Sequence, residues 1–210
     1  MPVIHAGHAD IPAISAVIAA AFIRLPQSRW IAPDDWPRAV TFPAYTKMQV
    51  EDALNDGTVH AWVTVGRQIR GAALWTWAEG YGSHPDAEEY AERLVVATGQ
   101  HVERYRLFEQ VVGDNAPPDG AAQVHLWMLG VHPDHQGQGI GTALLRCMHD
   151  GLDAAGYTAY LEAADQRSRA LYLRHGYIDA GPPYHLPESG PAFYPMLRRP
   201  EPRVDPASQP

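Results

Sequence analysis

A glycine-rich turn between a predicted strand and a predicted helix constrains this chain more than any other feature. Large apolar residues over 123–131 predict a buried strand, and a later helix is expected to end at Gly156. The turn between them contains Gly137, Gly139 and Gly141. Glycines let backbone amides approach a ligand closely, and the first amides of a helix stay unpaired at its positive end. This combination predicts a site for phosphate or pyrophosphate.

The glycine spacing argues against a dinucleotide as the phosphate-bearing ligand. A dinucleotide fold needs Gly-x-Gly-x-x-Gly, with an acidic residue about 20 residues later. Glu162 lies near that distance, but Gly141 comes one residue too early for the third glycine. The segment 131–137 is also longer than a dinucleotide turn. A dinucleotide oxidoreductase remains an alternative that tight NADH binding would support and CoA binding would exclude.

Two blocks of sequence resemble the GNAT family of N-acetyltransferases. Gln136-x-x-Gly139-x-Gly141, with the preceding run 131–135, is similar to the family's pyrophosphate loop. The strand 160–163, followed by Ser168, Tyr172 and Gly176-Tyr177, resembles the family's short helix and its glycine–aromatic end. The resemblance covers 123–198 well. Within the family it is most similar to puromycin N-acetyltransferase-type enzymes, through pieces such as 61–63, 73–76, 133–137 and 196–199.

The resemblance implies an activity and a cosubstrate. It implies transfer of an acetyl group from acetyl-CoA to the amine of a small molecule, such as an aminonucleoside antibiotic, in resistance or biosynthesis. The alternatives are a protein acetyltransferase for lysine or N-terminal amines, and a non-catalytic sensor that binds acyl-CoA. The resemblance also implies a mixed α/β (α+β) GNAT fold with about seven mostly antiparallel strands and about four helices.

The resemblance also implies which residues hold acetyl-CoA. A splayed strand end would present backbone amides to the acetyl carbonyl, and the turn would hold the pyrophosphate. Ser168 stands where the family often has asparagine, and its hydroxyl has a shorter reach. The expected contacts are Leu129, Gly130, Val131, Gln136, Gly137, Gln138, Gly139, Ile140, Gly141, Thr142 and Ser168.

Two side chains are candidates for acid–base chemistry. The motif position makes Tyr172 the expected general acid for the leaving thiolate, the alternative being a core aromatic. Glu162 lies in an otherwise apolar strand, where a carboxylate is costly unless it is used or paired. We therefore expect Glu162 to be the general base or to bind a cationic amine. His125, in the other motif strand, is either a proton relay or a satisfied core histidine.

The rest of the chain predicts alternating strands and helices in one domain over 1–199, with a disordered proline-rich tail over 200–210. The segment 30–43 is rich in aromatic residues and proline and is expected to be an irregular loop or short helical turns that set specificity, with Trp30 and Trp36 available to close a pocket. Apolar steps of three and four residues predict one long helix over 86–112. The other predicted strands are 3–6, 59–65, 72–77, 123–131, 158–163, 177–186 and 192–197, and the other helices are 10–23, 44–55, one ending at 155, and 167–175.

Composition limits the partners and the compartment. A formal net charge of −8 argues against a nucleic-acid binder and is compatible with a cationic substrate. The single cysteine, Cys147, rules out a disulfide within the chain and indicates the cytoplasm. No segment is expected to span a membrane. His132 and His135 have a spacing seen among metal ligands, but no third ligand is near them in the sequence. We therefore expect these histidines to cap the loop and to bind no metal. A monomer or a homodimer is expected.

Overall fold

The computed structural model describes residues 3–77, 87–118 and 120–201. Its mostly antiparallel sheet confirms the predicted α+β class, with eight strands rather than about seven. The strand order is β1-β2-β3-β4-β5-β8-β6, and β7 pairs with β8. The strands are β1 (Val3–His5), β2 (Gly57–Val63), β3 (Ile69–Trp77), β4 (Val124–Val131), β5 (Ala159–Ala163), β6 (Ile178–Asp179), β7 (Tyr184–His185) and β8 (Ala192–Arg198).

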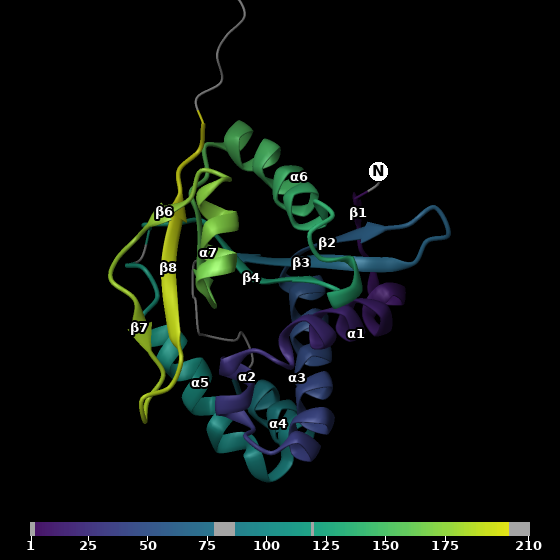
Figure 1. Cartoon of the computed structure of the whole chain (residues 1–210), viewed down its shortest axis with the longest axis vertical. Coiled ribbons are helices and arrows are strands. Elements are labelled where there is room, and N and C mark those ends of the chain that lie inside the picture. The colour runs from purple at the N-terminus through teal and green to yellow at the C-terminus, as the bar shows by residue number, and fades with distance from the viewer. Residues whose placement is uncertain (1–2, 78–86, 119, 202–210) are drawn as a thin grey trace, which may run out of the picture.

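Helices cover both faces of this sheet. Figure 1 shows α6 and α7 on one side of the central strands and α1 to α5 on the other. Each side has its own apolar cluster: Leu144 and Leu145 of α6 pack with Leu161 of β5, whereas Ile14 and Ile18 of α1 pack on the opposite face. The helices are α1 (Ile11–Phe22), α2 (Pro26–Ile31), α3 (Asp35–Asp56), α4 (Ala87–Thr98), α5 (Val102–Asp114), α6 (Ile140–Ala155) and α7 (Gln166–Leu173).

Segment 30–43 is more helical than the predicted irregular loop or short helical turns, and the loop alternative is wrong. This segment holds the end of α2 and the first part of α3, which continues through Pro43. Proline removes one helical hydrogen bond, but Phe42, Tyr45 and Met48 of α3 are buried against the core. Their burial offsets that loss, because tertiary packing supplies most of the stability of a helix.

The predicted long helix over 86–112 is two helices. Its first residue, 86, lies outside the described residues, and the chain is helical from Ala87. Gly99 has a φ of 55°, a left-handed conformation that ends α4 before α5 begins at Val102. The predicted apolar stripe still faces inward, since Leu94, Tyr105 and Val112 are buried.

The second half agrees more closely with the sequence. The helix predicted to end at 155 is α6, and Gly156 follows it with a φ of 72°. The predicted strand 177–186 is two short strands, β6 and β7. Most of the predicted tail 200–210 lies outside the described residues.

Candidate active site

The predicted phosphate loop forms an open turn at the start of α6. Gly137 and Gly139 have φ values of 76° and 80°, and no atom lies within 4 Å of where a Cβ would stand on either residue. Gly139 is the N-cap residue of the sixteen-residue helix α6. The first amides of this helix have no intrahelical acceptor, so they carry partial positive charge at an accessible place. The backbone here fits a phosphate or pyrophosphate group.

Side chains of the loop hold its backbone in this shape. Gln136 Nε2 donates to the carbonyl of Val131 over 3.2 Å, and Gln138 Nε2 donates to the carbonyl of Asp134 over 3.4 Å. His132 caps the short 3-10 turn Pro133–His135, its Nδ1 accepting from the amide of Asp134. His132 therefore has the capping role that its sequence predicted. Among the described residues, no group of three or more His, Cys, Asp or Glu could hold a metal ion.

Several of the other predicted cofactor residues lie near the same helix start, where a would-be Cβ on Gly141 would be 3.6 Å from Leu129 Cδ2. Leu129 and Val131 pack with the cluster beneath α6, whereas Gly130 faces α1, with Ile18 Cδ1 2.9 Å from a would-be Cβ. Thr142 Oγ1 lies 3.0 Å from His175 Nε2, which joins α6 to the end of α7. Ser168 Oγ donates to the carbonyl of Asp165, so its hydrogen is committed to the cap of α7.

The parallel strands β4 and β5 pair only at their beginnings. The register joins Val124 to Ala159 and His125 to Tyr160, and no later residue of either strand is paired across. From Leu126 onward β4 keeps its pairing with β3, while β5 keeps its pairing with β8. The two strands therefore separate in the direction of the phosphate loop. This is the splayed strand end that the resemblance implied, and it begins three residues earlier than Leu129.

A bulge in β4 turns two consecutive side chains to one side. Leu74 of β3 pairs with Met128 and Trp75 pairs with Leu126, so Trp127 is the extra residue. A bulge interrupts the alternation of side chains along a strand. Trp127 and Met128 consequently both line a pocket on the face of the sheet that carries α2, α3 and α5.

Glu162 and His125 form a buried pair on that face. His125 Nε2 donates to Glu162 Oε2 over 2.8 Å, and the two side chains are 1% and 6% exposed. Two phenols lie beside the carboxylate: burial, and then the charge of Glu162, raise the pKa of Tyr160 and of Tyr184 well above the usual range. The sequence thus correctly singled out a carboxylate that is buried and paired.

Tyr172 lies on the opposite face of the sheet from Glu162. It is 7% exposed and packs among the residues beneath α6 and α7, with its ring 5.6 Å from that of Tyr177. Burial, and then the charge of Asp165, raise the pKa of the Tyr172 phenol well above its usual range. The phenol therefore keeps its proton at neutral pH.

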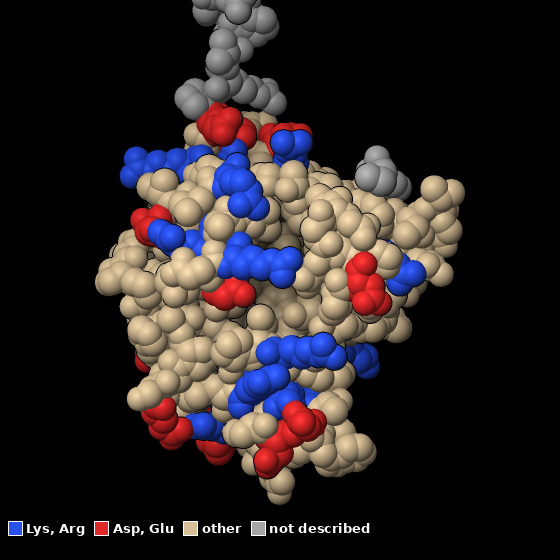
Figure 2. All heavy atoms as spheres, in the orientation of Figure 1, with Lys and Arg blue, Asp and Glu red and all other residues tan. Residues whose placement is uncertain are grey.

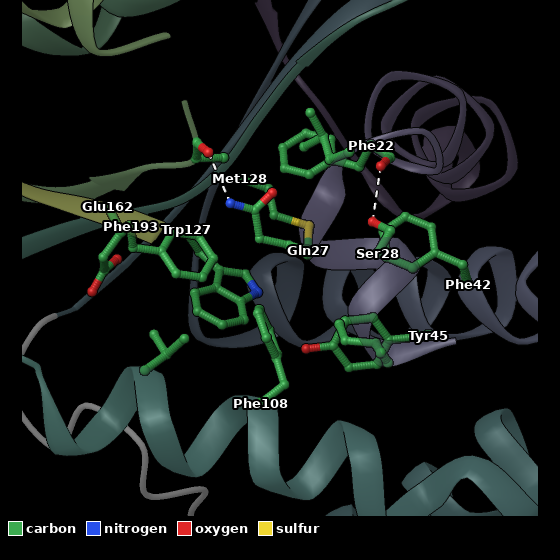
Figure 3. A pocket seen from close by; sticks show the side chains of 14 residues that line it. Phe22, Gln27, Ser28, Phe42, Tyr45, Phe108, Trp127, Met128, Glu162 and Phe193 are labelled. Atoms are coloured by element: carbon green, nitrogen blue, oxygen red, sulfur yellow. Dashed lines mark hydrogen bonds between the residues drawn. The ribbon is translucent and has the colours of Figure 1, made fainter. Parts of the chain in front are cut away.

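The pocket beside Glu162 is lined mainly by apolar side chains, many of them aromatic, as Figure 3 shows. Its volume is about 70 Å³. Helices α1 to α3, α5 and strands β4, β5 and β8 contribute to its wall. Its aromatic and polar lining residues are Phe22, Gln27, Ser28, Phe42, Tyr45, Phe108, Trp127, Glu162 and Phe193.

Sequence reasoning missed Gln27 and Trp127 as lining residues. Gln27 is 4% exposed and donates from Nε2 to the carbonyls of Ala164 (2.8 Å) and Ala192 (3.0 Å). These partners are far away in the chain, so no local pattern marks Gln27. Trp30 and Trp36, the tryptophans expected to close a pocket, do not line it; Trp30 donates to the carbonyl of Pro187, and Trp36 is 79% exposed.

Comparison with known proteins agrees with this geometry. Residues 90–179 match the family model described as an acetyltransferase (GNAT) domain. The fold matches a solved structure described as histone acetyltransferase HPA2 and related acetyltransferase from Corynebacterium glutamicum, with a TM-score of 0.68 and 26% identity over 97% of this chain and 98% of that chain. The protein is an N-acetyltransferase with the GNAT fold.

Two further structures share the fold of this acetyltransferase. Arylalkylamine N-acetyltransferase 2 from Aedes aegypti has a TM-score of 0.62 and 13% identity, covering 94% of this chain and 98% of its own. A polyamine N-acetyltransferase from Drosophila melanogaster has a TM-score of 0.60 and 14% identity, covering 94% of this chain and 99% of its own.

No helix in the described ranges of the acetyltransferase is both long and apolar enough to cross a membrane.

Proposed function

We propose that this acetyltransferase moves an acetyl group from acetyl-CoA to the amine of a small molecule, with Glu162 as the base and Tyr172 as the acid. The separation of β4 and β5 carries this proposal. The phosphate loop opens at the start of α6, on one side of the sheet, and Glu162 lines a pocket on the other side. A ligand anchored at the loop meets a ligand in the pocket only through an opening between these strands.

The residues at the loop and at the opening fit acetyl-CoA. Gly137 and Gly139 leave room for phosphate oxygens to reach backbone amides. Figure 2 shows Lys and Arg side chains on two sides of a hollow, over the regions of α7 and α2. Exposed arginines of these regions include Arg24, Arg29 and Arg167. A locally basic face on a chain of net charge −8 suits a ligand that carries several phosphates.

Residues on the two faces of the sheet would then carry out different steps of the reaction. Bound acetyl-CoA supplies the thioester. Backbone amides of β4 between Leu129 and Val131 would stabilise the developing oxyanion, and a donor of this kind contributes about 3 kcal/mol. Glu162 would accept a proton from the amine as the C–N bond forms. Tyr172 would donate its proton at the sulfur as the C–S bond breaks.

The pocket also supports a small amine over a protein substrate. Its walls enclose about 70 Å³, and Phe42 and Tyr45 of the buried part of α3 form one side of it. An aminonucleoside such as puromycin, with a role in antibiotic resistance or biosynthesis, remains the finer candidate from the sequence. We also propose a cytoplasmic location, because a single cysteine, Cys147, suits a reducing compartment. The proposed enzyme is a monomer or homodimer that uses no metal.

The test is release of free CoA thiol from acetyl-CoA with a panel of amines. The panel contains puromycin, other aminonucleosides, apolar alkyl and aryl amines, polyamines and a lysine peptide, with a blank that lacks amine. Release with a small amine is the expected result. Release with the peptide alone supports the protein acetyltransferase, and silence with every amine while acetyl-CoA binds supports the sensor.

A further inference from the structure

A chain of hydrogen bonds runs from the bulge of β4 to a carboxylate on α5. Trp127 Nε1 donates to Gln49 Oε1 over 2.7 Å, and Gln49 Nε2 donates to the Tyr90 hydroxyl over 3.0 Å. The Tyr90 hydroxyl donates to Glu109 Oε1 over 2.5 Å, and the same oxygen accepts from the Tyr45 hydroxyl over 3.0 Å. The chain therefore joins α3, α4 and α5 to β4 and ends at Glu109.

Two members of this chain line the pocket, and they come from different walls. Tyr45 belongs to α3 and Trp127 to β4. Figure 3 shows the phenol oxygen of Tyr45 and the indole nitrogen of Trp127 turned toward each other. Gln49, Tyr90 and Glu109 are not lining residues. A carboxylate outside the pocket is thus bonded, directly or through two side chains, to two rings inside it.

The chemistry of these groups fixes the direction of each hydrogen bond. An indole nitrogen only donates, so the Gln49 oxygen must face Trp127 and the Gln49 nitrogen must face Tyr90. Burial, and then the charge of Glu109, raise the pKa of Tyr45 and of Tyr90 well above the usual range. Both phenols therefore keep the hydrogens that they donate to Glu109. Hydrogen bonds to a charged acceptor are about twice as strong as neutral ones, so the carboxylate anchors the chain.

The residue at the other end of the chain lies where β4 and β5 separate. Trp127 is the extra residue of the bulge, and it follows closely after His125, the last residue of β4 that pairs with β5. A bulge bends its strand and re-aims a side chain. The position of the Trp127 ring is therefore coupled both to the wall of the pocket and to the course of β4 along the opening.

We propose that Glu109 is a positioning residue for acetyl transfer, which holds the rings of Tyr45 and Trp127 in the arrangement that binds the amine. This inference rests on the proposed function, because it is there that the pocket receives the amine. Glu109 touches neither ligand in this role and acts through the hydrogen-bonded chain alone.

The first experiment breaks the chain at Tyr90 and compares the result with a matched control. Tyr90→Phe removes the hydroxyl that links Gln49 to Glu109. Tyr105→Phe removes a hydroxyl that also joins α5 to α3, 3.0 Å from Thr41 Oγ1, but neither residue of that pair lines the pocket. Kinetics use acetyl-CoA and the panel amine with the highest rate.

The two Michaelis constants distinguish positioning from stability. We expect the KM for the amine to rise about tenfold in Tyr90→Phe and less than about twofold in Tyr105→Phe. The KM for acetyl-CoA should stay within about twofold in both, because the phosphate loop lies on the other face of the sheet. An unfolded fraction would lower the apparent kcat and leave both constants unchanged. Equal amine KM values for the two variants would overturn the inference.

The second experiment observes Trp127 directly and needs no turnover. The indole N–H groups of the six tryptophans give separate signals in a ¹H–¹⁵N NMR spectrum, and Trp127→Phe identifies the signal of Trp127. Hydrogen bonds in a chain polarise one another, so this signal should shift in Tyr90→Phe and in Glu109→Gln, which keeps the shape and removes the charge. It should stay in place in Tyr105→Phe. An unmoved Trp127 signal in Tyr90→Phe and Glu109→Gln would overturn the inference.

These outcomes separate the inference from the proposed function. If amines are acetylated but Tyr90→Phe behaves like Tyr105→Phe, the proposed function stands and only the role of Glu109 fails. If no amine releases CoA thiol, the proposed function fails. A Trp127 signal that shifts as expected would then still support the hold of Glu109 on the pocket, and an unmoved signal would overturn that as well.

Discussion

His125 on β4 donates a hydrogen bond to Glu162 on β5 at the last point where these strands still pair. Beyond it the strands separate, and Glu162 faces the aromatic pocket. The pair therefore fixes a carboxylate at the edge of the opening through which the proposed reaction takes place. Glu162 occupies the place that a proton acceptor for an amine in the pocket would need.

Replacing Glu162 by glutamine should remove the base while keeping an oxygen that accepts from His125. We expect kcat/KM to fall about 100-fold near pH 7, and less at alkaline pH, where more of the amine is already neutral. Initial rates across pH check this, with thermal unfolding to confirm the fold. An unchanged pH profile with unchanged activity would remove Glu162 from the mechanism.

Replacing Tyr172 by phenylalanine should slow the step in which the thiolate leaves. The proposed role of this phenol is to give a proton to the leaving thiolate, so its loss should lower kcat about 10- to 100-fold. The KM for the amine should stay nearly unchanged, because Tyr172 does not line the pocket. A kcat within about threefold of the parent would assign Tyr172 to packing alone.

The role of the N-terminus of α6 in binding acetyl-CoA can be tested with the C-terminus of the same helix as the control. Gly139 and Gly156 flank the helix with φ values of 80° and 72°, and neither has an atom within 4 Å of a would-be Cβ. Aspartate at either position thus meets similar backbone strain, but only Gly139→Asp places a negative charge at the phosphate loop. We expect the Kd of acetyl-CoA to rise at least about tenfold in Gly139→Asp and to change little in Gly156→Asp. Similar Kd values for both variants would mean that the loop lies elsewhere.

Two buried histidines should make the fold sensitive to mild acid. Burial, then His5, lowers the pKa of His60 to about 4, and burial, then Arg198, lowers the pKa of His149 to about 3. The unfolded chain binds protons near pH 6.5, so stability is fully present above that pH and is lost as pH falls toward the folded pKa values. Each histidine contributes up to about 1.4 kcal/mol per pH unit.

Urea unfolding at several pH values measures this loss. The free energy of unfolding of the parent should fall steeply between about pH 6.5 and pH 5, and His60→Asn should show a shallower slope. The comparison uses the slope and not the absolute stability, because the substitution also changes packing. Equal slopes for both proteins would contradict the assignment to His60.

Local signals predicted the second half of the chain better than the first. The glycines around α6 and the buried carboxylate in β5 each follow from a few neighbouring residues. By contrast, Pro43 argued locally against the helix in which it lies, and the burial of Phe42 and Tyr45 overrode that preference. Gln27 had no local signal, because its partners lie 137 and 165 residues away.

The proposed binding of acetyl-CoA and the amine on opposite faces of the sheet makes one kinetic measurement decisive. Initial rates with acetyl-CoA and an amine varied together should give intersecting double-reciprocal lines, since direct transfer needs both ligands bound at once. Parallel lines, together with an acetylated enzyme after incubation with acetyl-CoA alone, would show a covalent intermediate and contradict direct transfer of the acetyl group from acetyl-CoA to the amine.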